Sequence, residues 1–199
     1  VDNKYEISSM LESISKLDIQ EIQAEGIREI MSENNSFLRI EQMLKHLDMI
    51  QEYTYKRILV VGDNDDQNRK DFERQSATNK EFILKSELTR DLYEQYDYIV
   101  FFHDNYIYSE FYLEDLVNGF KYTDAESISK ATHGNDVYSF TKTVSDKYNT
   151  MFDTKKFDYD LLCNQSKPNS IESKGFIIDK LEIEYTLKNR NIHRFQTQK

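Results

Sequence analysis

The chain has 199 residues and a net charge of −10, from 36 acidic and 26 basic residues. This length suits one domain with an appendage, and the negative charge disfavours general binding to nucleic-acid phosphates, so we expect no nucleic-acid partner. The single cysteine, Cys163, excludes a disulfide within the chain and a zinc site of paired cysteines, which predicts a cytoplasmic protein. No apolar run approaches the roughly 20 residues of a membrane helix. The sequence begins at Val1 without Met, as a piece of a longer protein would.

Residues 5–52 have the pattern of helices, because apolar side chains recur at three- and four-residue steps. Asp18 is a candidate N-cap for the second helix. The apolar stripe of the third helix is predicted to be core; it consists of Phe37, Ile40, Met43, Leu44 and Leu47. We therefore predict a helical segment over 1–52 and a separate domain over 53–199.

The pattern changes after Lys56. Short apolar runs at 57–62, 81–85 and 98–102 alternate with amphipathic stretches, the last of which spans 109–122. This alternation predicts an α/β fold with these strands in one mainly parallel sheet and 109–122 as a helix packed on it. Weaker strand signals follow at 127–132, 137–141, 176–178 and 181–185. Residues 142–170 are polar and rich in Tyr and Asp.

Polar clusters follow the first and third of these strands, at 63–66 and 103–105. Ligands of open α/β sheets bind beyond the carboxyl ends of the strands, so neighbouring strands would bring both clusters to one crevice. Carboxylates there can bind ribose hydroxyls or hold a divalent ion that bridges to phosphates. The alternative is that both clusters are polar turns that only end their strands.

A family resemblance rests on three segments: the helix at 43–55, the strand and turn at 57–66, and the strand, turn and helix at 98–125. In order and spacing they resemble family 2 glycosyltransferases of the GT-A fold over about 80 residues, 41–121. The resemblance implies a GT-A sheet and transfer of a sugar from a nucleotide-sugar to a glycan acceptor. A weaker resemblance, at 26–30 and 36–39, is to spore-maturation glycosyltransferase-like proteins. It implies a spore-coat or cell-envelope polysaccharide as the acceptor.

The resemblance also implies site residues. Asp63 matches a nucleoside-contacting acid of the family, and with Asp65 and Asp104 it forms the implied nucleotide-binding set. His103, Asp104 and Asn105 align with the family's metal-binding Asp-x-Asp. They imply weak binding of Mn²⁺ or Mg²⁺, because only one of the three brings negative charge. No motif matches the family's catalytic base, so the catalytic residues are unknown; acids in the corresponding part of the chain are Asp153, Asp158 and Asp160.

Two departures from the family pattern leave the function open. In the family a first strand precedes the matched helix, but the corresponding part of this chain has a helical pattern. In addition, the metal-binding triplet is altered. The chain is therefore either a glycosyltransferase or a non-catalytic module of the same fold that partners an active one. A third alternative is an unrelated α/β fold.

Several single residues have plainer interpretations. His133 is interpreted as a turn residue, Cys163 as a bystander and the basic residues after 187 as a solvated tail. A group of tyrosines either stacks on a sugar or base or packs on the sheet: Tyr96, Tyr98, Tyr106, Tyr108 and Tyr112.

Overall fold

The computed structural model describes residues 4–33, 36–49, 56–63, 66–132, 137–163 and 170–186. The chain divides into two compact units, Val1–Tyr53 and Thr54–Lys199. Within the described ranges, no helix has both the length and the apolar character needed to cross a membrane.

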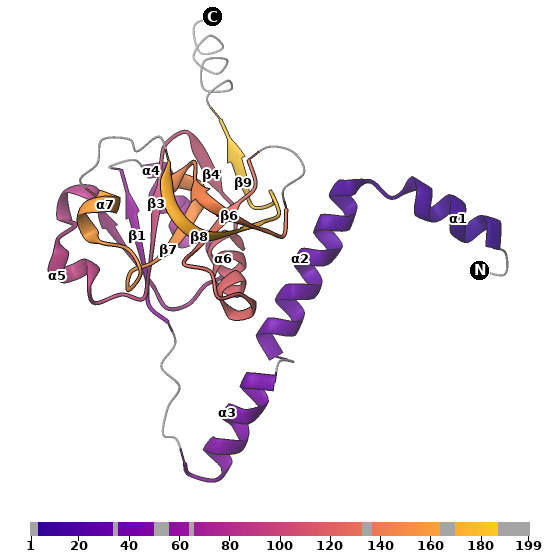
Figure 1. Ribbon diagram of the computed structural model, residues 1–199, viewed down its shortest axis with the longest axis horizontal. Helices are drawn as coiled ribbons and strands as arrows, with labels where there is room; N and C mark the ends of the chain where they lie inside the picture. Colours follow the sequence, from indigo (N-terminus) through magenta and orange to yellow (C-terminus); the bar gives the residue numbers. More distant parts are fainter. Residues whose placement is uncertain are drawn as a thin grey trace, which may run out of the picture. The chain divides into compact units, whose positions relative to one another are not determined.

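The first unit is helical, as predicted, with α1 (Lys4–Ser13), α2 (Lys16–Glu33) and α3 (Ser36–His46) (Figure 1). The prediction of Asp18 as the N-cap of α2 is wrong. The Ser15 hydroxyl accepts a hydrogen bond from the Asp18 N–H at 3.1 Å, and the Asp18 carboxylate accepts one from the Ser15 N–H at 2.8 Å. Ser15 is therefore the cap, and Asp18 is the third helical residue of a capping box.

The apolar stripe of α3 is not core within this unit. Ile40, Met43 and Leu47 are 53%, 63% and 64% exposed. The helical spacing is confirmed, but only Leu44 of the described stripe residues is partly buried.

The second unit is an α/β domain built on a seven-stranded sheet in the order β2-β1-β3-β7-β5-β8-β6. The strands are β1 (Ile58–Gly62), β2 (Lys80–Leu84), β3 (Tyr98–Phe102), β5 (Ser127–Lys130), β6 (Ser139–Val144), β7 (Thr150–Asp153) and β8 (Ile171–Ile178). Their pairings make five strands run in one direction, while β7 and β6 run in the other. A separate antiparallel pair joins β4 (Tyr106–Tyr108) to β9 (Ile183–Tyr185).

The three strands predicted most clearly are confirmed, and β1 lies between β2 and β3 with both pairs parallel. The predicted helix at 109–122 is also confirmed as α6 (Tyr112–Tyr122). The strand β7 was not predicted. It has only four residues, in a polar stretch, and it runs antiparallel between β3 and β5.

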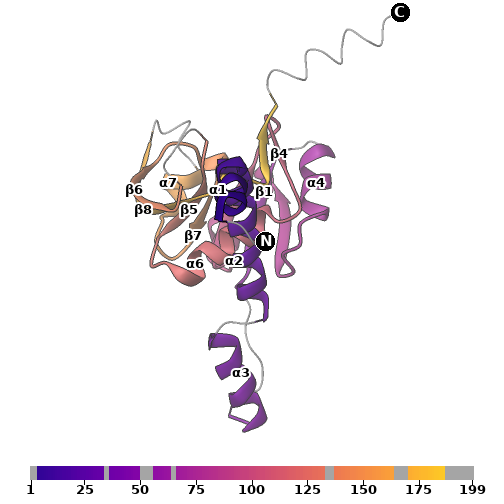
Figure 2. The same ribbon diagram turned by 90° about the vertical axis from the view of Figure 1, so that its right-hand side faces the viewer.

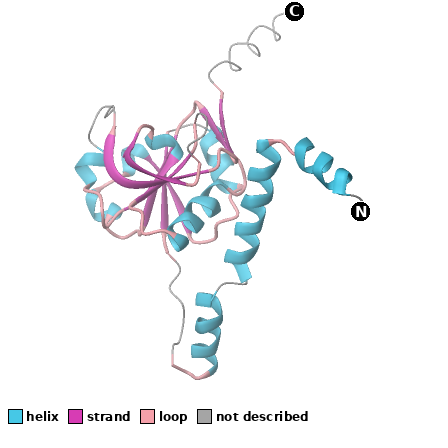
Figure 3. Ribbon diagram, turned by 45° about the vertical axis from the view of Figure 1, so that its right-hand side comes forward, coloured by secondary structure: helices cyan, strands magenta, loops and turns pink. Residues whose placement is uncertain are grey.

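Helices cover both faces of this sheet (Figures 1 and 2). On one face, α4 (Asp66–Glu73) and α6 contribute Phe72, Leu113 and Leu116 to an apolar cluster with alternate strand residues. On the other face, α5 (Arg90–Tyr93) and α7 (Tyr159–Cys163) pack on the intervening strand residues. The strands fan out with the twist of the sheet (Figure 3). The resulting two-sided core explains why β1 and β3 are apolar throughout.

A buried ion cluster joins α6 to the end of β5. The Lys130 ammonium lies 2.7 Å from the Asp115 carboxylate and 2.9 Å from the Asp179 carboxylate, and its side chain is fully buried. Asp179 directly follows β8, so Lys130 links the end of β5 to α6 and to the end of β8.

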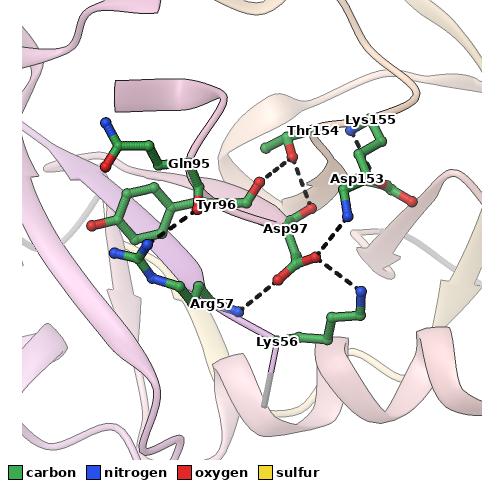
Figure 4. A network of polar contacts seen from close by, with 8 residues as sticks. All are labelled: Lys56, Arg57, Gln95, Tyr96, Asp97, Asp153, Thr154 and Lys155. Atoms are coloured by element: carbon green, nitrogen blue, oxygen red, sulfur yellow. Dashed lines mark hydrogen bonds and ion pairs between the residues drawn. The ribbon is translucent and has the colours of Figure 1, made fainter. Parts of the chain in front are cut away.

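The opposite, amino-terminal edge of the sheet is fastened by Asp97 (Figure 4). Its carboxylate accepts hydrogen bonds from Lys56 Nζ at 2.9 Å, the Arg57 N–H at 3.0 Å and Lys155 Nζ at 3.2 Å. The Thr154 hydroxyl donates to the Asp97 carbonyl at 3.1 Å. The start of β1, the start of β3 and the end of β7 are thus held together by one turn.

Candidate functional site

The candidate site lies at the carboxyl edge of the sheet, beyond β1 and β3. Gly62 is paired with Phe102, so Asp63 and His103 are the next residues of two neighbouring parallel strands. Val61 and Phe101 both belong to the cluster that α5 and α7 cover. Since strand side chains alternate between faces, Asp63 and His103 emerge on that same side. The expectation that the two polar clusters share one edge is therefore confirmed for these residues.

His103 is held by its own turn. Its backbone N–H donates to the Tyr108 hydroxyl at 3.1 Å, and its Nδ1 accepts a hydrogen bond from the Asn105 N–H at 3.1 Å. In the neutral ring the proton is consequently on Nε2, which leaves that atom for contacts with a ligand. The Asn105 carbonyl accepts the Thr186 N–H at 2.8 Å, and this bond fixes the turn to the end of β9.

Aromatic rings line this edge next to His103. The Tyr148 ring lies 4.4 Å from the His103 ring, and Tyr106 lies 6.5 Å from Tyr148 and 5.2 Å from Tyr185, centroid to centroid. Tyr185 is 57% exposed. Of the tyrosines singled out in the sequence, Tyr96, Tyr108 and Tyr112 are buried in the core and Tyr98 stacks on Phe120. Of these five, Tyr106 contributes its ring to the edge, and the buried Tyr108 contributes only its hydroxyl, which accepts the His103 N–H.

Asp146 is an acid at this edge that sequence reasoning missed. It precedes the 3₁₀ turn η2 (Lys147–Asn149), which leads into β7. Its carboxylate accepts hydrogen bonds from the Tyr106 hydroxyl and, at 2.8 Å, from the Tyr148 N–H. Burial and this carboxylate raise the pKa of the Tyr106 phenol, so that the hydroxyl stays a donor. Asp146 thereby positions both rings.

A buried amide lies on the α4 side of the same edge. Asn68 is fully buried, and neither its Oδ1 nor its Nδ2 has a hydrogen-bond partner within the described residues. A Cβ added to Gly62 would lie 3.4 Å from the Asn68 Cβ, which places this side chain against the end of β1. Buried amides are normally satisfied, so this position suits a water molecule or a polar ligand atom.

The metal triplet offers few donors. His103 already uses Nδ1, and Asp104 supplies the one carboxylate among His103, Asp104 and Asn105. Across the described ranges, no three His, Cys, Asp or Glu side chains converge closely enough to hold one ion. These residues do not form a complete site for Mg²⁺, which prefers several oxygen ligands. Weak binding of Mn²⁺ or Mg²⁺ stays a prediction.

The candidate catalytic acids are not brought to this edge. Asp153 is paired with Tyr98, the first residue of β3, whereas His103 follows the last, about 16 Å away along the strand. Asp158 and Asp160 are exposed at the start of α7, and both contact the Arg90 guanidinium. Asp65, His133 and the basic tail lie outside the described residues.

Cys163 is the last residue of α7 and packs against the apolar cluster on the α5 and α7 face of the sheet. Burial raises the pKa of its thiol to about 11. A thiol that remains protonated near neutral pH is a poor nucleophile, which agrees with its interpretation as a bystander.

A polar cavity of about 180 Å³ opens further along the sheet, between the end of β5 and β6. Six hydroxyl- or amide-bearing residues line it, together with the charged Lys130: Ser129, Thr132, Thr141, Thr143, Ser145 and Asn149. Ser129 is hydrogen-bonded to Thr150 at 2.7 Å, and Asn149 Nδ2 donates to the Lys130 carbonyl at 2.7 Å. Hydroxyl and amide groups thus predominate in the polar part of the wall, and the ammonium group of Lys130 is paired with Asp115 and Asp179.

Compared with models of known protein families, the chain matches none, and no curated protein sequence matches it.

Proposed function

We propose that Thr54–Lys199 is a glycosyltransferase-like domain that binds a nucleotide-sugar at the carboxyl edge of the sheet. The observation that carries the proposal is the juxtaposition of Asp63 and His103, one residue beyond paired residues of two parallel strands. Sheet edges of this kind are where α/β domains bind nucleotides. Asp63 accepts hydrogen bonds from the nucleoside in this proposal, and Asp65 and Asp104 are the other members of the nucleotide-binding set that the family resemblance implies.

Two further features support a sugar ligand. The rings of Tyr106, Tyr148 and Tyr185 offer an apolar surface with a polar tip, which suits the stacking of a base or a sugar ring. The polar lining of the cavity beside β5 is mostly hydroxyl and amide groups, and its one lysine, Lys130, is paired with two carboxylates, which suits the hydroxyls of a neutral acceptor. By its resemblances, the proposed acceptor is a polysaccharide of the cell envelope or spore coat, and the proposed location is the cytoplasm.

In the catalytic form of the proposal, a carboxylate takes the proton of an acceptor hydroxyl, whose oxygen attacks the anomeric carbon while the nucleoside diphosphate leaves. At the edge, Asp146 is already committed to Tyr106 and Tyr148. Asp153, Asp158 and Asp160 lie elsewhere. This arrangement favours the second candidate function, a non-catalytic binding or assembly module that partners an active glycosyltransferase.

A thermal-shift screen of nucleotide-sugars, with and without Mn²⁺, tests the binding step. A ligand that binds only the folded state raises the melting temperature by mass action. At a ligand concentration of 100 times its Kd, the free energy of unfolding increases by about 2.7 kcal/mol. A shift with UDP- or GDP-sugars, together with release of the nucleotide when an acceptor glycan is added, supports the enzyme. A shift without turnover supports the binding module, and no shift with any nucleotide-sugar contradicts the proposal.

A further inference from the structure

Two lysines extend the edge on either side of Asp63. Leu84, the last residue of β2, is paired with Gly62, so Lys85 follows β2 at the level where Asp63 follows β1. Ile83 and Val61 belong to the same apolar cluster, which predicts that Lys85 emerges on the same face as Asp63 and His103. Lys85 is exposed, at the start of the 3₁₀ turn η1 (Lys85–Glu87).

Lys147 reaches the same face from η2. Its Nζ lies 4.6 Å from the centroid of the Phe101 ring, two residues before His103, and 5.5 Å from the Tyr148 ring. It also donates to the Leu162 carbonyl at 3.4 Å. The ammonium group is therefore held against the core beside His103.

Neither ammonium group forms an ion pair with a carboxylate of the described residues. Burial lowers the pKa of Lys147, and the positive charge of Lys85 lowers it further, while Asp63, Asp146 and Cys163 act in the opposite direction. Lys85 follows β2 and Lys147 lies against Phe101 of β3, so the two lysines flank the end of β1 on one face of the sheet. A half-buried cation that forms no ion pair with a carboxylate of the described residues is costly, and an anion bound at this edge would lower that cost.

We propose that Lys147 and Lys85 bind the diphosphate of a nucleotide ligand at this edge. The nucleotide part rests on the proposed function, whereas the phosphate site rests on the two lysines. In this arrangement the ammonium groups donate charge-assisted hydrogen bonds to phosphate oxygens. The charge of the bound diphosphate is then balanced by side chains next to the altered metal triplet.

The test is calorimetric titration of the whole chain with pyrophosphate and, separately, with UDP and GDP. Lys147→Gln and Lys85→Gln should each weaken pyrophosphate binding about tenfold or more, and Lys147→Arg should retain most of it. Lys156→Gln is the matched control. That lysine is exposed and follows β7 at the opposite edge, so its removal should change affinity less than about twofold.

A proton measurement separates phosphate binding from a structural effect of the lysine. A bound anion favours the charged amine, so binding above pH 8 should take up protons from the buffer, and the Lys147→Gln variant should lose that uptake. If the Lys147→Gln variant does not fold, Lys85→Gln still tests the site, because Lys85 is exposed and its replacement should not disturb the core.

The outcomes also separate the two proposals. Lysine-dependent binding of pyrophosphate without any gain from the nucleoside supports the phosphate site and contradicts the proposed function. Nucleotide binding that both glutamine variants retain supports the function and overturns the lysine site. Absence of pyrophosphate binding to the unmodified chain at about 10 mM overturns the lysine site as well.

Discussion

Asp63 is the residue on which the nucleotide proposal depends most directly. Replacing it with Ala removes charge-assisted hydrogen bonds worth about 1.5–3 kcal/mol each, so UDP or GDP binding should weaken about tenfold or more. The melting temperature should hardly change, because Asp63 lies outside the strand, directly after β1, and is only partly buried. Calorimetric titration measures the affinity. Glu94→Ala is the control, since Glu94 is exposed near the opposite edge; equal affinity in Asp63→Ala and the original chain would contradict the assignment.

The metal triplet permits a gain-of-function experiment. Replacing His103 and Asn105 with Asp restores the Asp-x-Asp pattern and, with Asp104, gives three carboxylates at the turn. Mn²⁺ binding should tighten because hard cations prefer charged oxygen ligands. The double variant also loses the bond from the Asn105 N–H to His103 Nδ1, so its melting temperature must be recorded alongside. Micromolar Mn²⁺ affinity in the original chain would contradict the prediction that the altered triplet binds metal weakly.

What the sequence could predict at this scale was the position of the polar residues after apolar runs. The runs ending at Gly62 and Phe102 placed Asp63 and His103 correctly at one edge, because strand ends are visible in hydrophobicity. Asp146 and Lys147 were not foreseen. They reach the edge only because β7 runs antiparallel, and its short Met151-Phe152 run inside a polar stretch does not indicate direction.

The contact between α6 and β5 gives a prediction about elements. A Cβ added to Gly119 would lie 2.8 Å from Cγ2 of the fully buried Ile128. Gly119→Ala should therefore destabilise the domain by about 1–3 kcal/mol, despite the better helix propensity of alanine. In an Ile128→Ala background this penalty should disappear. Urea denaturation of the four chains measures the coupling.

The matched control for that experiment is Gly26→Ala in α2, where an added Cβ would meet nothing within 4 Å. There, only propensity acts, so helix stability should rise by up to about 1 kcal/mol. Destabilisation by both alanines to the same extent would contradict an explanation by close approach.

The Asp97 turn makes the stability of the strand ends depend on pH. Burial acts to raise the pKa of Asp97, but hydrogen bonds from Lys56, the Arg57 N–H and Lys155 outweigh it and lower the pKa. A carboxyl group with a lowered folded-state pKa contributes stability above its unfolded pKa of about 3.9, and this contribution is lost as the pH falls through the folded-state pKa. Asp97→Asn should thus lower the free energy of unfolding at pH 7 by about 1–2 kcal/mol.

Urea denaturation at several pH values tests this dependence. The range should extend from about 1.5 pH units below the unfolded-state pKa of Asp97 to about four pH units above it. The curves for Asp97→Asn and the original chain should converge at the acidic end. Asp124→Asn serves as the control, because Asp124 pairs with Lys174 on the exposed surface, where such pairs contribute little. A difference that stays constant down to the acidic end would rule out titration of Asp97 as its cause.

At the scale of the whole molecule, the two units differ in how much apolar surface they bury. The sheet unit has a two-sided core, whereas Ile22, Ile30, Met43 and Leu47 of the helical unit are each more than half exposed. Local opening is easiest where few apolar contacts are lost. In hydrogen exchange, amides of α1, α2 and α3 should exchange at least about 100-fold faster than those of β1, β3 and α6. This ratio corresponds to a difference of about 2.7 kcal/mol in the free energy of opening. Equal protection would show that the units unfold together.

The position of β1 also decides how the domain bears a mechanical load. Lys56 and Arg57 lead directly into β1, which is hydrogen-bonded on both sides, to β2 and β3, rather than at an edge of the sheet. A pull on Lys56 directed along β1 would load both parallel ladders in shear together and would act on the Asp97 contacts first. Tension transmitted from the N-terminal side would therefore meet its resistance at the Asp97 end of the sheet, remote from Asp63 and His103.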